Sequence, residues 1–126
     1  MMKISESELE VMRLLWETPN QPLTFSEIRD ALQAEHGWTN STVKTLIYRL
    51  VDKGAVQQEK RDVYYYTSLV DQQAYSAQAM RTMVSKLSGG SVAQLLAGMI
   101  EEEAITPQEL DELRALLHEK GGRDHE

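Results

Sequence analysis

The stretch from Thr39 to Gly54, "TNSTVKTLIYRLVDKG", constrains the fold of this chain more than any other segment. Thr39 is a typical helix N-cap, and Gly54 is a typical stop. Between them, five aliphatic residues follow the spacing i, i+3, i+4, i+7 and i+8 on one side of a helix: Val43, Leu46, Ile47, Leu50 and Val51. A helix this short is not stable alone in water, so other elements must cover its apolar side.

Two helices are predicted before this one. Ser5 with Glu8, and Thr24 with Glu27, have the spacing of capping boxes, in which each side chain bonds the other residue's backbone N–H. The first helix reaches about residue 17, and Gly37 ends the second. Their predicted apolar stripes are Leu9, Met12, Leu15 and Trp16 in the first, and Phe25, Ile28 and Leu32 in the second.

After Gly54 the sequence changes to short runs that favour strands. "AVQQE" (55–59) and "VYYYT" (63–67) flank the charged "KRD" (60–62), which predicts a β-hairpin. Three helices followed by a two-stranded wing make a winged helix-turn-helix. We therefore predict a winged-helix domain over residues 1–69 in a chain that is mainly α with a small β-hairpin.

Residues 70–120 predict three more helices, followed by a frayed tail at 121–126. Their apolar stripes are too large to bury one another completely within a single chain. A two-fold homodimer is the commonest way to cover such surfaces, and a monomeric helical lid on the winged helix is the alternative. The residues expected to hold the dimer are Leu95, Leu96, Met99, Ile100, Leu113 and Leu117.

The helix that begins after Thr39 carries a polar face opposite its aliphatic stripe. Short hydroxyls can bond phosphates or base edges, and arginine can bind guanine with two bonds. The side chains on this face and its flanks are Ser41, Thr42, Lys44, Thr45, Tyr48, Arg49 and Asp52. Lys60 and Arg61, at the predicted hairpin tip, are placed to contact an adjacent phosphate. This pattern predicts DNA binding, and a merely solvated helix face is the alternative.

The charge distribution supports a localised anion site. Residues 1–37 hold three basic and seven acidic residues, residues 38–67 hold five and three, and residues 68–126 hold five and ten. The balances are therefore −4, +2 and −5, which sum to the net charge of −7. One basic segment in an otherwise acidic chain indicates a localised site for an anion and not a surface that binds anions non-specifically.

Several classes of protein are excluded or disfavoured. The chain has no cysteine, which excludes disulfides and thiolate metal sites. His36, His118 and His125 are scattered, so we predict no metal and no cofactor. No residues assemble a nucleophile, a base and an oxyanion site, so we predict that the protein is not an enzyme. The sequence shows neither a signal peptide nor an apolar run of membrane-spanning length, which predicts a cytoplasmic protein.

Four blocks resemble the BlaI/MecI/CopY family of bacterial repressors: "ISESELEVMRLLWE", "WTNSTVKTLIYRLVDKGAV", "YYYTSLV" and "GGSVAQLLAGMIEEEAITPQELDELRALL". The resemblance runs in register from Ile4 to about Lys120, and Thr42 to Leu46 is its most specific part. It implies a dimeric winged-helix repressor that blocks promoters of resistance genes. It also implies which residues would contact operator DNA: Ser41, Thr42, Lys44, Thr45 and Arg49, with Lys60 and Arg61 on the wing.

The resemblance further implies how the repressor is released. In relatives controlled by a membrane sensor protease, a cut in the middle C-terminal helix destroys the dimer. The matching bond here, placed by "IEEE", is Gly98–Met99, where better-known members have asparagine and an aromatic residue. The copper-responsive branch carries a cysteine-rich hook, which this chain lacks. The alternative function is a dimeric winged-helix module that binds a protein partner, for which Tyr48 and the run 64–66 are the hints.

Overall fold

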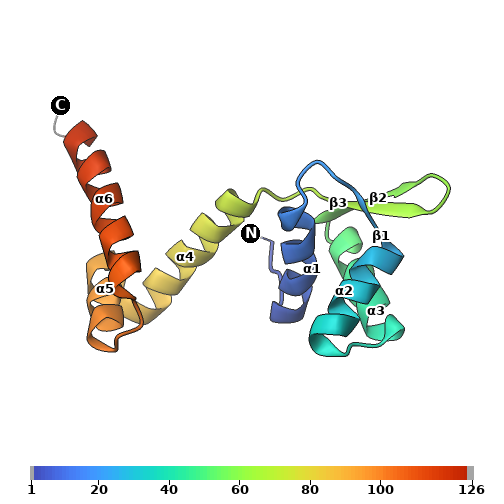
Figure 1. Ribbon diagram of the computed structural model, residues 1–126, viewed down its shortest axis with the longest axis horizontal. Helices are drawn as coiled ribbons and strands as arrows, with labels where there is room; N and C mark the ends of the chain where they lie inside the picture. The colour runs from blue at the N-terminus through green and yellow to red at the C-terminus, as the bar shows by residue number, and fades with distance from the viewer. Residues whose placement is uncertain (1, 125–126) are drawn as a thin grey trace. The chain divides into compact units, whose positions relative to one another are not determined.

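The computed structural model describes residues 2–124, without the side chains of Ser88 and residues 121–124. The chain divides into two compact units, Met1–Ser76 and Ala77–Glu126 (Figure 1). The elements of the N-terminal unit are α1 (Glu6–Glu17), β1 (Leu23–Thr24), α2 (Phe25–His36), α3 (Asn40–Asp52), β2 (Val56–Lys60) and β3 (Tyr64–Ser68). α4 (Gln72–Ser88) begins in this unit, and α5 (Val92–Glu101) and α6 (Pro107–Asp124) follow.

Both predicted capping boxes at the start of the chain are present. The Ser5 N–H donates to Glu8 Oε1 at 2.9 Å, and the Glu8 N–H donates to Ser5 Oγ at 3.1 Å. Thr24 and Glu27 make the same reciprocal pair before α2. Gly37 ends α2 with φ 70°, a left-handed conformation that costs glycine little, and its N–H donates to the Gln33 carbonyl. Local sequence signals therefore set these helix ends.

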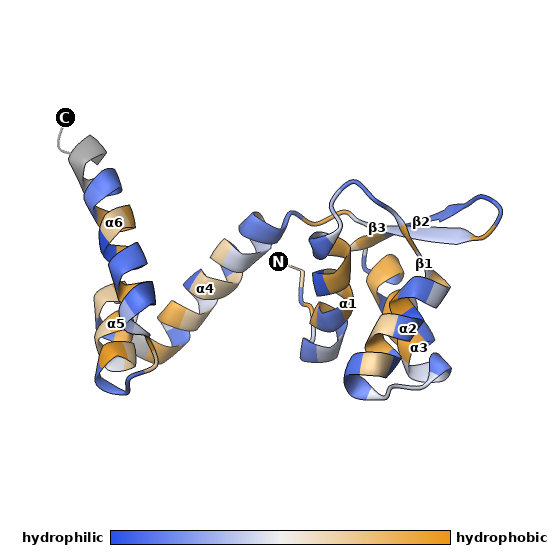
Figure 2. Ribbon diagram, in the orientation of Figure 1, coloured by the Kyte–Doolittle hydropathy of each residue, from blue (hydrophilic) through white to orange (hydrophobic). Residues whose placement is uncertain are grey.

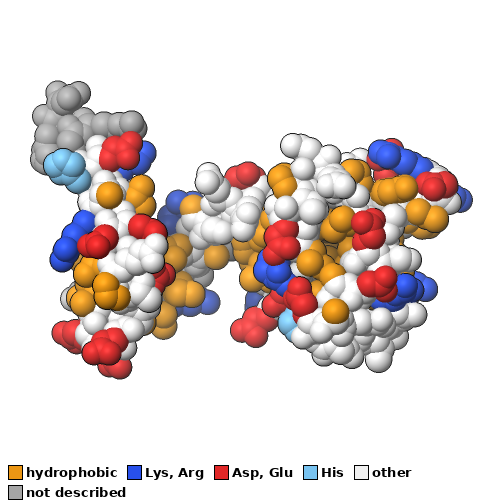
Figure 3. Space-filling view, viewed as in Figure 1, with side chains coloured by type: hydrophobic (Ala, Val, Ile, Leu, Met, Phe, Trp, Pro, Cys, Tyr) orange, Lys and Arg blue, Asp and Glu red, His pale blue; other side chains and the backbone are white. Residues whose placement is uncertain are grey.

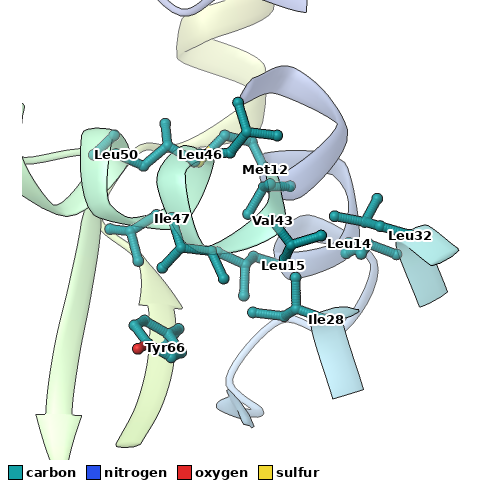
Figure 4. Packing of buried hydrophobic residues seen from close by; sticks show 13 residues of the cluster. Met12, Leu14, Leu15, Ile28, Leu32, Val43, Leu46, Ile47, Leu50 and Tyr66 are labelled. Atoms are coloured by element: carbon teal, nitrogen blue, oxygen red, sulfur yellow. The ribbon is translucent and has the colours of Figure 1, made fainter. Parts of the chain in front are cut away.

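The three helices of the N-terminal unit bury their apolar sides against one another (Figures 2 and 4). Val43, Leu46, Ile47 and Leu50 of α3 are buried as predicted, whereas Val51 is half-buried. The stripe predicted for α1 is wrong at Leu9, which is 37% exposed. The buried side chains of α1 are Glu8, Val11, Met12, Leu14 and Leu15. A glutamate in this stripe is the reason that periodicity alone placed the face incorrectly.

The predicted hairpin is present, but it belongs to a three-stranded sheet. β2 pairs antiparallel with β3 in the register Val56↔Ser68 to Lys60↔Tyr64. A short strand that sequence analysis did not predict, β1, pairs with the other edge of β3, giving the order β1-β3-β2. Two residues are too few to show a strand periodicity, and Thr24 also carries the stronger signal of a helix cap. The sheet fixes the hairpin beside α3.

The C-terminal residues form the three predicted helices. α6 continues to Asp124, past the predicted start of a frayed tail at residue 121, and residues 125–126 lie outside the described residues. The N-terminal unit ends at Ser76, seven residues after the end predicted for the winged-helix domain at residue 69. No helix within residues 2–124 is long and apolar enough to cross a membrane.

An ion pair between a buried carboxylate and a partly exposed lysine joins the start of α1 to the end of α3. Glu8 is 3% exposed, and Lys53 Nζ lies 3.0 Å from its Oε1 and 2.9 Å from its Oε2. The contact to Oε1 has hydrogen-bond geometry, whereas Oε2 is stabilised by charge alone. Lys53 Nζ also donates to the Lys3 carbonyl at 2.7 Å. Burial opposes ionisation of Glu8, but hydrogen bonds from Lys53 and Ser5 outweigh it and lower the pKa of this carboxyl.

Glu8→Gln is expected to lower the free energy of unfolding of the N-terminal unit by ~1.5–3 kcal/mol, because it removes a hydrogen bond between charged groups in a buried site. Because the folded-state pKa lies below 4.5, the contribution of Glu8 is complete above about pH 4.5 and is lost as the pH falls through the lower value. Tryptophan fluorescence in urea measures this unit selectively, since Trp16 and Trp38 both lie in it.

The exposed Glu6 of the same helix turn provides the control. Glu6→Gln should leave stability nearly unchanged. If Glu8→Gln had no larger effect than Glu6→Gln at pH 7, the ion pair would not stabilise the fold.

Candidate nucleic-acid interface

Burial of one side of α3 leaves the opposite side in solvent. The predicted contact residues of this helix are all exposed: Ser41, Thr42, Lys44, Thr45 and Arg49. Thr39 caps the helix by accepting from the Thr42 N–H at 3.2 Å, and the two hydroxyls lie 3.1 Å apart. The first turn of α3 therefore offers hydroxyls and unpaired backbone N–H groups on a surface that the core does not use.

The basic side chains of the N-terminal unit fall into two groups. Those held by acidic partners are Arg13, Arg29, Lys53 and Arg61. In contrast, no ion pair forms at Lys44, Arg49 or Lys60 within the described part of the chain, nor at Lys3. Lys44 and Arg49 lie on the flanks of the outward face of α3, and Lys60 ends β2. These three cations are available to an anion without breaking an existing pair.

Lys60 and Arg61, the two residues predicted to contact DNA from the wing, have different surroundings. Arg61 donates to both Glu59 oxygens, at 3.2 and 3.3 Å, and its guanidinium carbon lies 5.1 Å from the centre of the Tyr65 ring. The hydrogen bond to Glu59, followed by the charge of Glu59, raises the pKa of Arg61. Lys60 has no such partner in the described residues. A phosphate could therefore bind Lys60 directly, whereas Arg61 would have to leave Glu59.

A hollow of about 410 Å³ joins the beginning of α1 to the outward face of α3. Ser5 and Ser7 line it from α1 and its cap, and Ser41, Thr45 and Arg49 line it from α3. Sequence analysis identified Ser5 as a cap and did not connect Ser7 with this face. The side chains that surround this hollow mostly carry hydroxyls, and its one guanidinium, that of Arg49, forms no ion pair with any residue that the structure describes.

A second polar cluster brings Glu10, Glu35 and His36 together, with possible metal-ligand atoms within 4.8 Å of one another. Sequence analysis did not predict this cluster, because the residues are far apart in the chain. Arg13 occupies it, with Nε 3.0 Å from Glu10 and a terminal nitrogen 2.5 Å from Glu35. The guanidinium takes the oxygens that a metal ion would need, so we interpret the cluster as an ion-pair network between α1 and α2.

The predicted dimer residues are exposed or half-buried in the single chain. Met99, Ile100 and Leu117 are 38%, 47% and 60% exposed, and Leu95, Leu96 and Leu113 are half-buried. Hydrophobic side chains are visible on the surface of the C-terminal unit in Figure 3. Further exposed apolar residues of α4, α5 and α6 are Met80, Met83, Leu87, Val92 and Leu116. Exposed apolar residues in this number favour a protein partner.

The sequence matches the family model described as penicillinase repressor over residues 4–119. A methicillin resistance regulatory protein MecI of Mammaliicoccus sciuri is 29% identical over 119 residues, which cover 94% of this chain and 95% of that protein. A penicillinase repressor of Bacillus licheniformis is 26% identical over 125 residues, which cover 98% of this chain and 96% of that protein.

Two solved structures are similar to part of the chain. The solution structure of the DNA binding domain of the repressor BlaI has a TM-score of 0.52 and 33% identity, and covers 60% of this chain and 94% of that one. The solution structure of monomeric Bacillus licheniformis BlaI in complex with the blaP half-operator has a TM-score of 0.51 and 32% identity, and covers 59% of this chain and 89% of that one. The predicted winged-helix fold is confirmed.

Lys44→Ala and Arg49→Ala are each expected to change the free energy of unfolding by less than about 0.5 kcal/mol, because neither side chain makes an ion pair in the described residues. Leu46→Ala, on the buried side of the same helix, should cost ~2–5 kcal/mol. Urea unfolding followed by tryptophan fluorescence compares them. If Lys44→Ala or Arg49→Ala lowered the free energy of unfolding by more than about 1 kcal/mol, the replaced side chain would contribute to the stability of the fold.

Proposed function

Because the chain belongs to the penicillinase repressor family, a family of transcriptional repressors, we propose that it binds a palindromic operator sequence-specifically as a homodimer. Its targets would be resistance-type genes or its own operon. The observation that carries this proposal is the outward face of α3, opposite a buried aliphatic stripe. Hydroxyls lie there together with cations that form no ion pair among the described residues.

On this proposal α3 enters the major groove. Ser41, Thr45 and Arg49 would reach base edges, while Lys44 and the wing Lys60 would bind phosphates on either side. The N–H groups at the start of α3 add partial positive charge near a phosphate. The complex of a BlaI of similar structure with a half-operator supports DNA as the partner of this fold.

A protein-interaction module is the second candidate. Tyr48 is 70% exposed on α3 and Tyr64 is 44% exposed on β3, so an apolar partner surface exists beside the polar face. However, the contact face and its flank carry Ser41 and Lys44, and serine and lysine are depleted at protein interfaces. The polar composition therefore favours DNA over a protein partner for α3.

The homodimer is supported by the exposed apolar side chains of the C-terminal unit. Packing against a second copy about a two-fold axis, the commonest symmetry of oligomers, would cover the stripe that contains Met99 and Ile100. Two winged helices linked in this way can bind both halves of a palindrome. Each bound half raises the effective concentration of the other, which adds affinity without new contacts.

Release of DNA would then follow from separation of the two chains. Gly98–Met99, the candidate cleavage bond, lies inside α5, so a sensor protease would need this helix to open before cutting. Glycine weakens a helix interior by about 1 kcal/mol relative to alanine, which favours such opening. A Cβ at Gly98 would meet no atom within 4 Å among the described residues, so packing does not require a glycine there.

Lys60→Ala is expected to weaken binding to operator and unrelated duplex alike, and to reduce the slope of log affinity against log salt by ~0.9, the share of one phosphate. Arg61→Ala should have a smaller effect, because Arg61 is already paired with Glu59. Fluorescence anisotropy at several salt concentrations measures the affinity and the salt slope of both variants. Arg29→Ala, which removes a cation paired with Asp30, is the matched control. An unchanged salt slope for Lys60→Ala would exclude the wing contact.

Ile100→Asp is expected to separate the dimer, because it places an unpaired charge in an apolar contact. Sedimentation at micromolar concentration should change from about twice the monomer mass to the monomer mass, and operator affinity should fall by ~10²–10⁴. Gln94→Asp, on the side of α5 opposite the apolar stripe, is the control. It should change neither the sedimenting mass nor the operator affinity. A monomeric unmodified chain, or an intact Ile100→Asp dimer, would contradict the proposed assembly.

A further inference from the structure

A groove of about 930 Å³ lies between α3, the start of α2 and the outer part of the hairpin, wholly within the N-terminal unit. Its apolar lining includes Phe25, Ile47, Tyr48, Val51, Val63 and Tyr64. The volume is typical of small-molecule sites, which are mostly apolar with a few polar groups. The DNA contacts proposed above do not use this lining.

The groove exists because the outer half of the hairpin extends beyond the helices on which its inner half packs. Side chains alternate across a strand, so Tyr64 and Tyr66 of β3 share one face with Gln58 and Lys60 of β2. Tyr66 is 8% exposed and belongs to the core, whereas Tyr64 is 44% exposed and Val63 is 50% exposed. Figure 1 shows the hairpin extending past the helices of this unit. The outer half of this sheet face therefore has no helix packed under it.

The charged groups that line the groove are Lys44, Lys60 and Asp62. Neither lysine has an ion pair within residues 2–124, and the two come from opposite walls, α3 and β2. Figure 3 shows hydrophobic side chains together with basic and acidic ones at the end of the hairpin. The two lysines outweigh the one carboxylate, so the charged lining has a formal charge of +1. Such a lining is complementary to a molecule with an apolar body and one negative group.

We propose that this groove binds a small amphipathic anion, with its apolar body between Tyr48 of α3 and Tyr64 of β3 and its carboxylate between Lys44 and Lys60 of the same two walls. A bound anion would neutralise two cations that, on the proposed function, bind phosphates, and it would fill the space between α3 and the wing. We further infer that such a ligand releases operator DNA without proteolysis. This regulatory inference rests on the proposed function.

DNA alone does not account for the groove. A phosphate needs cations and hydrogen-bond donors, and burying it against Val51, Val63 or Phe25 would remove its hydration without replacement. A small ligand with separate apolar and anionic parts uses both kinds of lining at once.

The test titrates the full-length protein with 2-naphthoate, using amide chemical shifts and calorimetry, with uncharged 2-naphthamide as the matched probe. We expect shifts centred on Lys44, Tyr48, Val63 and Tyr64. Tyr64→Ser, Lys60→Ala and the change to the amide should each weaken binding about tenfold, equivalent to 1.4 kcal/mol. Tyr65→Ser removes the neighbouring tyrosine from the other face of β3, and should leave affinity within about twofold.

Shifts confined to residues 77–120, equal binding of the amide, or an unchanged affinity of Tyr64→Ser would each overturn the proposed site. A second titration adds 2-naphthoate to the protein–operator complex, and we expect DNA to be released. Ligand binding in the groove with the operator still bound would overturn the regulatory part. If the ligand-free protein failed to bind any operator, the proposed function would fail, and the titration without DNA would still decide whether the groove is a ligand site.

Discussion

The burial of one side of α3 is the constraint on which the N-terminal unit depends. Val43, Leu46, Ile47 and Leu50 are each about 0–5% exposed, and burying one such side chain is worth ~1.5–3 kcal/mol. With these four in the core, the rotation of the helix about its axis is fixed, and the hydroxyls and cations opposite them must face solvent. The ion pair of Glu8 with Lys53 holds the far end of the same helix against α1. The interface is thus a consequence of the packing.

The distribution of ion pairs explains how an acidic protein can still present a surface for DNA. With a net charge of −7, the chain as a whole repels nucleic acid. Arg13 and Arg29 are held by acidic neighbours on α1 and α2, while Lys44 and Lys60 are left unpaired among the described residues. Attraction is therefore local, which lowers affinity for unrelated DNA. On the proposed function, tight binding then requires the correct sequence and two linked copies.

The sequence predicted the elements that are specified locally and missed what depends on distant residues. Capping boxes and the stripe of α3 gave helix ends and the exposed face, because each signal lies within a few residues. The stripe of α1 was misplaced because buried Glu8 has a partner 45 residues away, which no local pattern contains. β1 was missed for the same kind of reason, because this two-residue strand exists only through its pairing with the distant β3.

On the proposed function, two copies of α3 present their outward faces to the two halves of one operator. Because the chain has no cysteine, a single introduced thiol can carry an iron-chelate reagent that cleaves DNA at the position it touches. From Ser41→Cys we expect two clusters of cuts, one in each half-site, separated by about 10–10.5 base pairs or a multiple of that spacing. Gln21→Cys, in the loop after α1, should give no specific cuts. A single cluster, or equal cleavage from both positions, would contradict the claim.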